Sequence, residues 1–360
     1  MRYTPNVLHI SRTMGQGGAE KIVEQLCCDI KNHKFIVAST GGYRINNLKK
    51  HHTAHYTIPD IASKNPFTMF KTIIILKSII KKERIGIIHS HHRMAAFYAQ
   101  LLKMQHPKLR LIYTAHNVYT DKKKLSHFSF RDTKIIACGK SVEKNLTDFY
   151  QLPSNQIALI TNSVKKPELH ETNLLPPKPK GQVYLASISR ITNDKGIDIF
   201  IQALSLIKQN NSLNFHAFII GDGEQRHELE NQTKRLGLSN HITFLGFQQD
   251  ALSIITPIDI LISPSRREGL PLTLIELLAI GKPVIVSDID NHKEIITDKR
   301  NGLLFKSEDT ESLAAQIIRL ATGLKLQSKI RQNAKSTYDH TYNYINFLKK
   351  YNSLYGENHA

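Results

Sequence analysis

The sequence predicts an α/β protein made of two consecutive doubly wound domains. Short apolar runs alternate with amphipathic stretches, the alternation stops at a proline-rich segment (164–181), and it then starts again. Alternating strands and helices form a parallel sheet that is covered by helices on both faces. The length of 360 residues also suits two domains of ordinary size.

The first domain, residues 1–163, is expected to contain seven strands and four helices. The strands are short runs rich in β-branched and aromatic residues, at 7–11, 35–40, 54–59, 85–90, 110–116, 134–138 and 157–162. The helices show apolar positions at helical spacing, at 18–31, 66–82, 93–105 and 140–150. Ligands bind such sheets outside the carboxyl ends of the strands, so the residues after each strand are the candidates for a site.

Segment 164–181 contains four prolines and no apolar periodicity, which indicates a linker. The second domain, residues 182–340, then repeats the pattern. Its expected strands are 183–189, 215–221, 242–246, 260–265 and 284–288, and its expected helices are 195–209, 224–236, 248–254, 271–280 and 308–322.

The net charge of +19 is concentrated in the first half of the chain. Residues 1–163 hold 25 Lys and Arg against 9 Asp and Glu, whereas residues 164–360 hold 24 against 21. Nucleic acid, an anionic membrane surface or an anionic substrate would each explain a basic half. A solvated basic surface without a partner is the remaining interpretation.

The composition favours a cytoplasmic protein. Cys27, Cys28 and Cys138 offer neither a disulfide framework nor a CxxC pair, and no stretch has the apolar length of a membrane span. Residues 1–11 lack the apolar core of a secretory leader and are interpreted as a first buried strand.

A glycine-rich turn follows the first strand. Gly15, Gly17 and Gly18 would let backbone amides approach a phosphate at the start of helix 18–31. The spacing is not G-x-G-x-x-G, and no acidic residue is placed to hold a ribose, so a nicotinamide dinucleotide site is not supported. A tight turn without a ligand is the alternative.

Histidines end two strands of the first domain. His116 ends strand 110–116, where it would touch substrate hydroxyls or remain an ordinary loop residue. His89, His91 and His92 end strand 85–90. Metal binding by this cluster has no supporting Cys, Asp or Glu spacing, so polar strand ends are the preferred interpretation and no metal site is expected.

In the second domain, Arg190 follows the first strand and Lys195 opens the next helix. A guanidinium and an ammonium beside a helix N-terminus suit a diphosphate, although two exposed basic residues are the alternative. Gly221 follows the next strand and lets backbone approach a ligand there.

The most specific pattern is Ser263 to Pro271, which begins in the last residues of strand 260–265 and continues into the loop after it. Glu268 lies in the loop and Glu276 lies one turn into the next helix, with Gly269 and Leu270 between them. Two carboxylates and free amides at a helix N-terminus would bind a sugar phosphate together with its hydroxyls.

These motifs together resemble the family-four retaining glycosyltransferases of GT-B architecture, in which two Rossmann-like domains face a cleft. The similarity covers most of the chain, in the order Gly17–Glu20, Thr114–Asn117, Ser187–Gly196, Gly221–Gly223, Phe244–Phe247, Ser265–Pro271, Glu276, Gly281–Val284 and Asn301–Leu304. In that family the last helix packs back on the N-terminal domain, which residues from about 341 to 360 would do.

The resemblance implies a role for each matched residue. Arg190 and Lys195 would neutralise the diphosphate leaving group, Glu276 would accept from the ribose, and Glu268 would face the transferred sugar with the amides near Gly269 and Leu270. Gly17 and Gly18 would let their loop approach donor and acceptor, His116 would lie near the sugar, and Phe247 near the nucleobase. The sequence departs from the family pattern at two positions, so the resemblance does not define the shape of the donor pocket. Ser163 replaces the usual Gly of Asn-Gly-Val, and Leu270 replaces a common Phe.

The resemblance further implies a retaining transferase that moves a sugar from a nucleotide-diphosphate sugar, with a UDP-sugar expected, to a glycan or lipid-linked acceptor in lipopolysaccharide, O-antigen or capsule synthesis. Arg190 and Lys195 would take the place of a metal ion in neutralising the diphosphate, and no metal and no cofactor are expected. Front-face attack is preferred, with a double displacement through Glu268 as the alternative.

Other functions remain as alternatives. A GT-B epimerase is one, and a phosphorylase, which would need lysine-bound pyridoxal phosphate, is another. A nucleic-acid-binding protein would require aromatic platforms, tandem basic helices or a zinc pattern, none of which is found, so nucleic acid is not the expected partner.

An anionic membrane surface is a further expected partner. Lys122, Lys123 and Lys124 stand beside Phe128 and Phe130, which predicts a basic and aromatic surface for peripheral attachment to the inner face of the membrane. Helix 66–82 is also lysine-rich and could lie in the same interface, although packing of its apolar residues in the core is the preferred interpretation.

Overall fold

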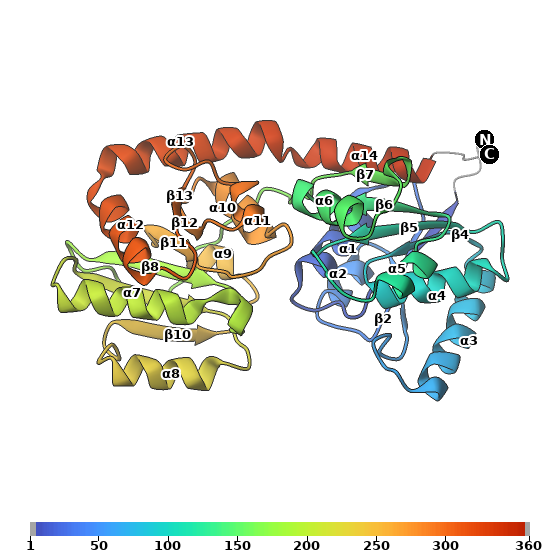
Figure 1. Cartoon of the computed structure of the whole chain (residues 1–360), viewed down its shortest axis with the longest axis horizontal. Coiled ribbons are helices and arrows are strands. Elements are labelled where there is room, and N and C mark those ends of the chain that lie inside the picture. Colours follow the sequence, from blue (N-terminus) through green and yellow to red (C-terminus); the bar gives the residue numbers. More distant parts are fainter. Residues whose placement is uncertain (1–4, 357–360) are drawn as a thin grey trace. The chain divides into compact units, whose positions relative to one another are not determined.

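The computed structural model describes residues 5–356, and contacts between Cα atoms divide the chain into two units. Met1–Val164 and Tyr344–Ala360 form one, called the N unit, and Lys165–Asn343 form the other, called the C unit. Each contains one parallel sheet with helices on its faces, so the predicted pair of doubly wound domains is confirmed (Figure 1). The segment expected as a linker has no helix or strand, and contacts group it with the C unit from Lys165 onward.

The N-unit sheet has the strand order β3-β2-β1-β4-β5-β6-β7. Its strands are β1 (Asn6–Ile10), β2 (Phe35–Ser39), β3 (Ala54–Thr57), β4 (Ile85–Ser90), β5 (Arg110–Ala115), β6 (Thr133–Ala137) and β7 (Ile157–Leu159). Its helices are α1 (Gly18–Asp29), α2 (Ile45–Lys50), α3 (Pro66–Lys82), α4 (Arg93–Lys103), α5 (Lys123–Ser129), α6 (Lys140–Asp148) and α14 (Tyr344–Gly356), with a 3₁₀ turn at Ser154–Gln156. The strand order reverses between β1 and β4, which makes this pair the switch point where doubly wound sheets bind ligands.

Helix α14 completes the N unit although it lies at the far end of the chain. The Tyr344 hydroxyl donates to Asp29 Oδ2 at 2.6 Å, and the Arg110 guanidinium donates to the carbonyls of Leu354 and Tyr355 at 2.9 and 3.1 Å. Tyr351 and Tyr355 are fully buried. The chain therefore returns to its first domain through aromatic packing and hydrogen bonds to helix ends.

The C-unit sheet has the order β10-β9-β8-β11-β12-β13, and its switch point lies between β8 and β11. Its strands are β8 (Val183–Ile188), β9 (Phe215–Ile220), β10 (Ile242–Gly246), β11 (Ile260–Ser263), β12 (Val284–Ser287) and β13 (Leu303–Phe305). Its helices are α7 (Ile197–Gln209), α8 (Arg226–Arg235), α9 (Ala251–Ile254), α10 (Leu272–Ile280), α11 (Asp290–Lys293), α12 (Thr310–Thr322) and α13 (Leu324–Thr341), with a 3₁₀ turn at Asn193–Lys195.

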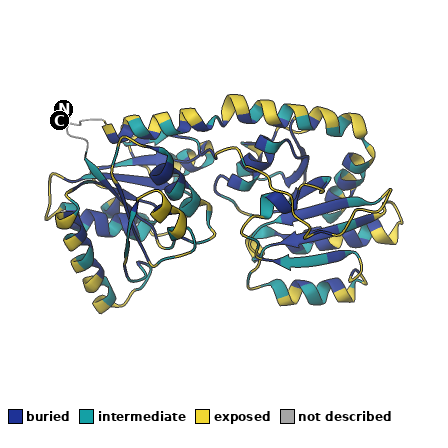
Figure 2. Ribbon diagram, turned by 180° about the vertical axis from the view of Figure 1, so that it is seen from behind, coloured by how far each residue is buried: buried dark blue, intermediate teal, exposed yellow. Residues whose placement is uncertain are grey.

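Burial follows the predicted strands in both units. The strands are mostly buried, and the outer faces of the helices are exposed (Figure 2). Cys27, Cys28 and Cys138 are buried free thiols. Within residues 5–356 no helix combines the length and the apolar character needed to cross a bilayer.

Five elements were not expected from the sequence: α2, α5, α11, α13 and β13. Four of them are short, and a run of three to seven residues gives little periodicity. The fifth, α13, is long but strongly polar. Its buried positions are Ile330, Ala334 and Tyr338, a narrow stripe at four-residue spacing that packs against α10.

Candidate functional site

The C-unit switch point brings the predicted diphosphate residues and the Glu268 loop together. Gly196 ends the 3₁₀ turn that contains Lys195, and its φ is +63°. A Cβ atom there would lie 2.2 Å from the Pro264 carbonyl oxygen, so only glycine lets the turn after β8 touch the loop after β11. The Arg266 amide also donates to the Asp194 carbonyl at 2.8 Å, which joins the same two segments.

Lys195 and Glu268 form an ion pair inside this contact. Lys195 Nζ lies 2.6 Å from Glu268 Oε1, and the Ser265 hydroxyl donates to the same oxygen at 2.8 Å. Both charged side chains are mostly buried. Arg190, by contrast, is exposed and has no hydrogen bond or ion pair with any described residue. One cation is thus held beside a carboxylate, and a second remains available to an anionic ligand.

Arg266 fixes the loop that carries Glu268. Its guanidinium makes two 2.8 Å hydrogen bonds to the Asp198 carboxylate and two more, at 2.7 and 3.1 Å, to Glu308. The hydrogen bonds to Asp198 are the main reason that the pKa of Arg266 is raised above its usual value. Because the planar Arg266 guanidinium binds two carboxylates at once, it holds the loop backbone in one conformation.

The end of the loop presents unsatisfied backbone donors. No described group accepts a hydrogen bond from the amides of Gly269 and Leu270, and Pro271, the N-cap of α10, provides no side-chain cap. Glu276 lies in the middle of α10 and is buried. Free amides at a helix N-terminus favour a phosphate or another anion.

The ends of β9 and β10 complete this edge of the C unit. Gly221 has φ +140°, and a Cβ atom there would lie 1.8 Å from the Ser189 carbonyl oxygen, so the turn after β9 packs directly on the turn that leads to Arg190. Phe247 directly follows β10 and is 41% exposed, which is unusual for a ring of this size.

The sequence analysis missed His292, which lies beneath the Glu268 loop. It is fully buried, and its Nδ1 lies 3.0 Å from both the hydroxyl and the carbonyl oxygen of Ser287. The Ser287 hydroxyl donates to the Ser265 carbonyl at 2.6 Å, so it accepts from His292 Nδ1. Burial lowers the pKa of His292 to about 4. His292 lies in α11, the short helix that follows β12, and this place after a strand end was the available signal.

In the N unit, the predicted glycine turn lies at the switch point between β1 and β4. Gly17 is the N-cap of α1 and Gly18 is its first residue. The preceding residues are anchored by a segment that the sequence analysis did not single out: the Met14 amide donates to the Gly41 carbonyl at 2.8 Å, and Arg44 Nε donates to the Gly15 carbonyl at 2.8 Å.

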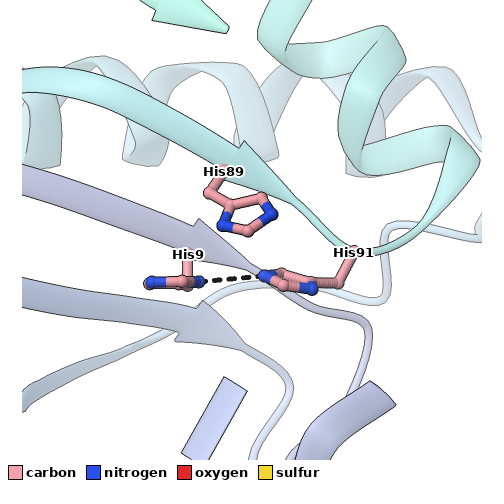
Figure 3. A group of neighbouring side chains, drawn as sticks. All are labelled: His9, His89 and His91. Carbon is pink, nitrogen blue, oxygen red and sulfur yellow. Dashed lines mark hydrogen bonds between the residues drawn. The ribbon is translucent and has the colours of Figure 1, made fainter. Parts of the chain in front are cut away.

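His116 lies at the same edge, directly after β5, and is half-buried. Its Nε2 is 3.0 Å from Nδ1 of His91, which follows β4. Burial lowers the pKa of His116 to about 4, so the imidazole is neutral at pH 7. The structure thus connects His91 and His116, which the sequence placed at the ends of two separate strands. It adds His9 from β1, which the sequence analysis did not select and which contacts His91 (Figure 3).

Two family models match the chain, one for each unit. Residues 16–166 match the model described as Glycosyltransferase Family 4, and residues 175–337 match the model described as Glycosyl transferases group 1. The chain therefore belongs to the glycosyltransferases, and its two Rossmann-like domains give it the GT-B fold.

Several known proteins are similar over most of the chain. An uncharacterized glycosyltransferase of Methanocaldococcus jannaschii is 25% identical over 330 residues, which cover 89% of each chain. The UDP-Gal:alpha-D-GlcNAc-diphosphoundecaprenol alpha-1,3-galactosyltransferase of Escherichia coli is 24% identical over 308 residues, covering 79% of each.

Solved structures share the fold at low sequence identity. A glycosyltransferase from Rickettsia africae superposes with a TM-score of 0.80 at 23% identity and covers 98% of both chains. The Anabaena protein HepE, solved in complex with UDP and glucose, gives a TM-score of 0.83 at 17% identity and covers 98% of this chain and all of its own. Two further similar proteins are glycosyltransferases of O-antigen biosynthesis and of lipopolysaccharide core biosynthesis. These similarities support glycosyl transfer in polysaccharide synthesis.

Proposed function

We propose that this glycosyltransferase moves a sugar from a nucleoside-diphosphate sugar, of the UDP class, to a glycan or lipid-linked acceptor, with retention of anomeric configuration and without a metal ion or a further cofactor. The observation that carries the proposal is the Lys195–Glu268 pair beside free amides at Gly269 and Leu270. Two similar proteins support the donor class, since the galactosyltransferase of Escherichia coli is named for UDP-Gal and HepE was solved in complex with UDP.

The chemistry follows from the charges at this edge of the C unit. Departure of a nucleoside diphosphate builds negative charge on the β-phosphate, and fixed cations and amides stabilise that charge without reorganisation. Arg190 and Lys195 would supply the cations, and the α10 N-terminus would supply the amides. Glu276 would accept from the ribose hydroxyls, and Phe247 would lie against the base.

Retention is proposed through front-face attack. Glu268 Oε1 already binds Lys195 and Ser265, which favours a carboxylate that orients the sugar and the cation over one that attacks the anomeric carbon. In front-face attack the leaving phosphate helps to remove the acceptor proton, so no protein nucleophile is required. Double displacement through Glu268 is the competing route.

The N unit is proposed to serve the acceptor. His116 and the Gly17–Gly18 turn lie at the switch-point edge of its sheet, and a neutral imidazole there would hydrogen-bond to sugar hydroxyls.

The test is a thermal-shift screen of the full chain with UDP-, GDP- and ADP-sugars, followed by turnover with the donor that binds. We expect stabilisation by UDP-sugars that persists in EDTA. Stabilisation by another nucleotide alone would reject the UDP class, and loss in EDTA with recovery on adding Mg²⁺ or Mn²⁺ would reject metal independence. The anomeric proton coupling in the product's NMR spectrum tests retention.

The proposed localisation is cytoplasmic, with the N unit on the anionic inner face of the membrane. The predicted surface needs one correction: Phe130 is buried and stacks on Tyr113 at 4.6 Å, and Phe128 packs against Phe97. The aromatic groups beside Lys122–Lys124 are therefore not exposed membrane anchors, because Phe130 lies in the core and Phe128 is half-buried against α4.

Helix α3 provides exposed apolar groups instead. Phe67, Phe70 and Ile74 are 86%, 66% and 50% exposed, and their spacing places them on one side of the helix. The helix contains four lysines and no acidic residue. An apolar stripe among lysines suits the boundary of an anionic bilayer, so α3 joins Lys122–Lys124 in the proposed membrane surface.

A further inference from the structure

Four histidines from three neighbouring strands lie together at the switch point of the N unit. His9 belongs to β1, His89 to β4, and His91 and His116 follow β4 and β5. His9, His89 and His91 are buried, with neighbouring ring centroids 4.1 to 5.1 Å apart (Figure 3). Burial lowers the pKa of each, so all are neutral at pH 7.

Two separate hydrogen-bond systems run through these rings. One is a chain in which His9 Nδ1 lies 2.9 Å from His91 Nε2, and His91 Nδ1 lies 3.0 Å from His116 Nε2. In the other, His89 uses both nitrogens at 2.8 Å, on the hydroxyls of Tyr355 and Thr114. The first system ends at the half-buried His116, whereas the second ties β4 to α14.

Three imidazoles this close would also suit a metal ion, but the bonding favours hydrogen bonds. Both nitrogens of His89 are already engaged. A tetrahedral Zn²⁺ with bonds of about 2.0 to 2.1 Å separates its nitrogen ligands by about 3.4 Å, wider than the 2.9 Å between His9 and His91. Among residues 5–356 no carboxylate hydrogen-bonds to these rings to offset a buried divalent charge.

The chain couples the tautomers of its three members. Each neutral imidazole has one N–H and one bare nitrogen, so a donor at one link forces a donor at the next. Either every proton points from His9 towards His116, or every proton points the other way. The state of His9 Nε2 at the buried end therefore fixes the state of His116 Nδ1 at the open end.

The buried end selects the direction. His9 Nε2 is buried and has no hydrogen-bond partner among the described residues. In protein interiors a buried N–H without an acceptor is rarer than a buried acceptor without a donor. His9 Nε2 is then bare, His9 Nδ1 donates to His91, and His91 Nδ1 donates to His116 Nε2.

We propose that His91 is a positioning residue that holds His116 as its Nδ1–H tautomer, so that His116 meets its ligand as a hydrogen-bond donor and not as a base. This assignment rests on the proposed function only for the identity of the ligand, an oxygen of the sugar substrate. The tautomer itself belongs to the free protein.

The side chain of His91 offers a matched pair of variants. In His91→Asn, the amide stands near the place of Nδ1 and still donates to His116 Nε2. In His91→Gln, the amide stands near the place of Nε2 and reaches His9 only. Both remove one imidazole from the same buried position, so their folding costs are comparable, and unfolding curves check this.

The measurement is the ¹⁵N spectrum of histidine side chains in the full chain labelled with ¹⁵N-histidine, with His116 assigned by its loss in His116→Gln. We expect Nδ1–H and bare Nε2 for His116 in the wild type and in His91→Asn, and the reverse tautomer or a mixture in His91→Gln. An Nε2–H tautomer in the wild type, or the same His116 tautomer in all three proteins, would overturn the proposal. One equivalent of bound Zn²⁺ that shifts His9 and His91 would also overturn it, because the metal would replace their hydrogen bond.

Turnover separates this proposal from the proposed function. If His116 acts as a donor to the sugar, His91→Gln raises KM or lowers kcat by about 10-fold, the scale of one hydrogen bond, and His91→Asn recovers most of the loss. A wild-type tautomer as expected with no effect of His116→Gln on turnover would refute the substrate role of His116 alone.

Discussion

Lys195 has two competing partners, the Glu268 carboxylate that it contacts in the structure and the diphosphate that it is proposed to bind. A lysine held by a carboxylate is pre-positioned, so little side-chain entropy is lost when an anion arrives. Arg190 has no such partner within residues 5–356 and would be ordered by the ligand. Lys195 is therefore already positioned before the diphosphate binds, whereas Arg190 loses side-chain entropy when it binds the diphosphate.

Replacing Lys195 with Ala should lower kcat/KM by about 30- to 1000-fold, because losing one preorganised donor costs about 2 to 4 kcal/mol of transition-state stabilisation. Arg190→Ala should fall in the same range. Steady-state kinetics with the identified donor measures both effects. The matched control is Lys234→Ala, which removes an exposed lysine from α8. Near-normal turnover in the Arg190/Lys195 double variant would reject the diphosphate assignment.

Glu276→Gln should mainly raise KM for the donor, by about 10- to 100-fold, the cost of losing a charge-assisted hydrogen bond. A ribose contact is the same in the ground and transition states, so kcat should change little. The amide keeps the shape of the buried side chain. If kcat falls while isothermal titration shows unchanged donor affinity, Glu276 does not bind the ribose.

The conformation of the loop from Pro264 to Pro271 is held by hydrogen bonds to residues elsewhere in the C unit. Arg266 fixes one side through Asp198 and Glu308, and the Ser287 hydroxyl fixes the other through the Ser265 carbonyl. His292 orients that hydroxyl. Residues at or after the carboxyl ends of β8, β12 and β13 thus hold one short loop. This support positions Glu268 and the free amides of Gly269 and Leu270 for a phosphate.

Ser287→Ala should destabilise the C unit by about 1 to 3 kcal/mol, because the buried Ser265 carbonyl loses its donor. It should also reduce the thermal stabilisation gained from the nucleotide, since the loop is less well positioned. Differential scanning fluorimetry with and without UDP measures both changes. Ser212→Ala, at an exposed turn after α7, should change neither. Full nucleotide stabilisation in Ser287→Ala would show that this hydroxyl does not position the loop.

Buried neutral histidines in both units make the stability of the whole chain depend on pH. Burial lowers the pKa of His9 to about 3 and of His292 to about 4, from an ordinary value of 6.5. Below pH 6.5 the unfolded chain therefore binds protons that the folded chain does not. The free energy of unfolding should fall as pH decreases from 6.5 towards 4, by about 1.4 kcal/mol per pH unit for each such group.

Urea unfolding at pH 7.5, 6.5, 5.5 and 4.5 measures this dependence. His292→Asn lowers the absolute stability but should also make the pH slope of the C-unit transition shallower, because one buried imidazole is gone. His227→Asn, at an exposed position on α8, should leave the slope unchanged. Equal slopes in wild type and His292→Asn would mean that His292 titrates normally in the folded protein.

The charge division of the chain leads to a prediction about membranes. Co-sedimentation with phosphatidylglycerol vesicles should exceed that with phosphatidylcholine vesicles and should weaken with salt, because each lysine near an anionic surface contributes about 1 kcal/mol. Phe67→Ser/Phe70→Ser and Lys122→Glu/Lys123→Glu/Lys124→Glu should each reduce binding. Leu324→Ser, which removes an exposed apolar side chain from the C unit, is the control. Equal sedimentation with both lipids, unaffected by these variants, would reject the membrane surface.

The sequence by itself determined the two-domain α/β architecture, because apolar periodicity and the turn-forming residues at strand ends are local properties of the chain. It also selected the residues at the ligand edges, since parallel strands place their carboxyl ends together whatever the details of packing. Arg190, Lys195 and Glu268 could be singled out in this way. Their roles remain predictions, but their common location in the C unit follows from the order of β8 and β11.

Only the tertiary structure decided which side chains share a partner or a surface. The bond from Lys195 to Glu268 joins residues 73 positions apart, and that from His9 to His91 joins residues 82 apart. The exposure of Phe67 and the burial of Phe130 likewise depend on which helix face meets the sheet. Spacing along the chain cannot specify such contacts, because they depend on strand order and on side-chain directions that are set when distant segments pack.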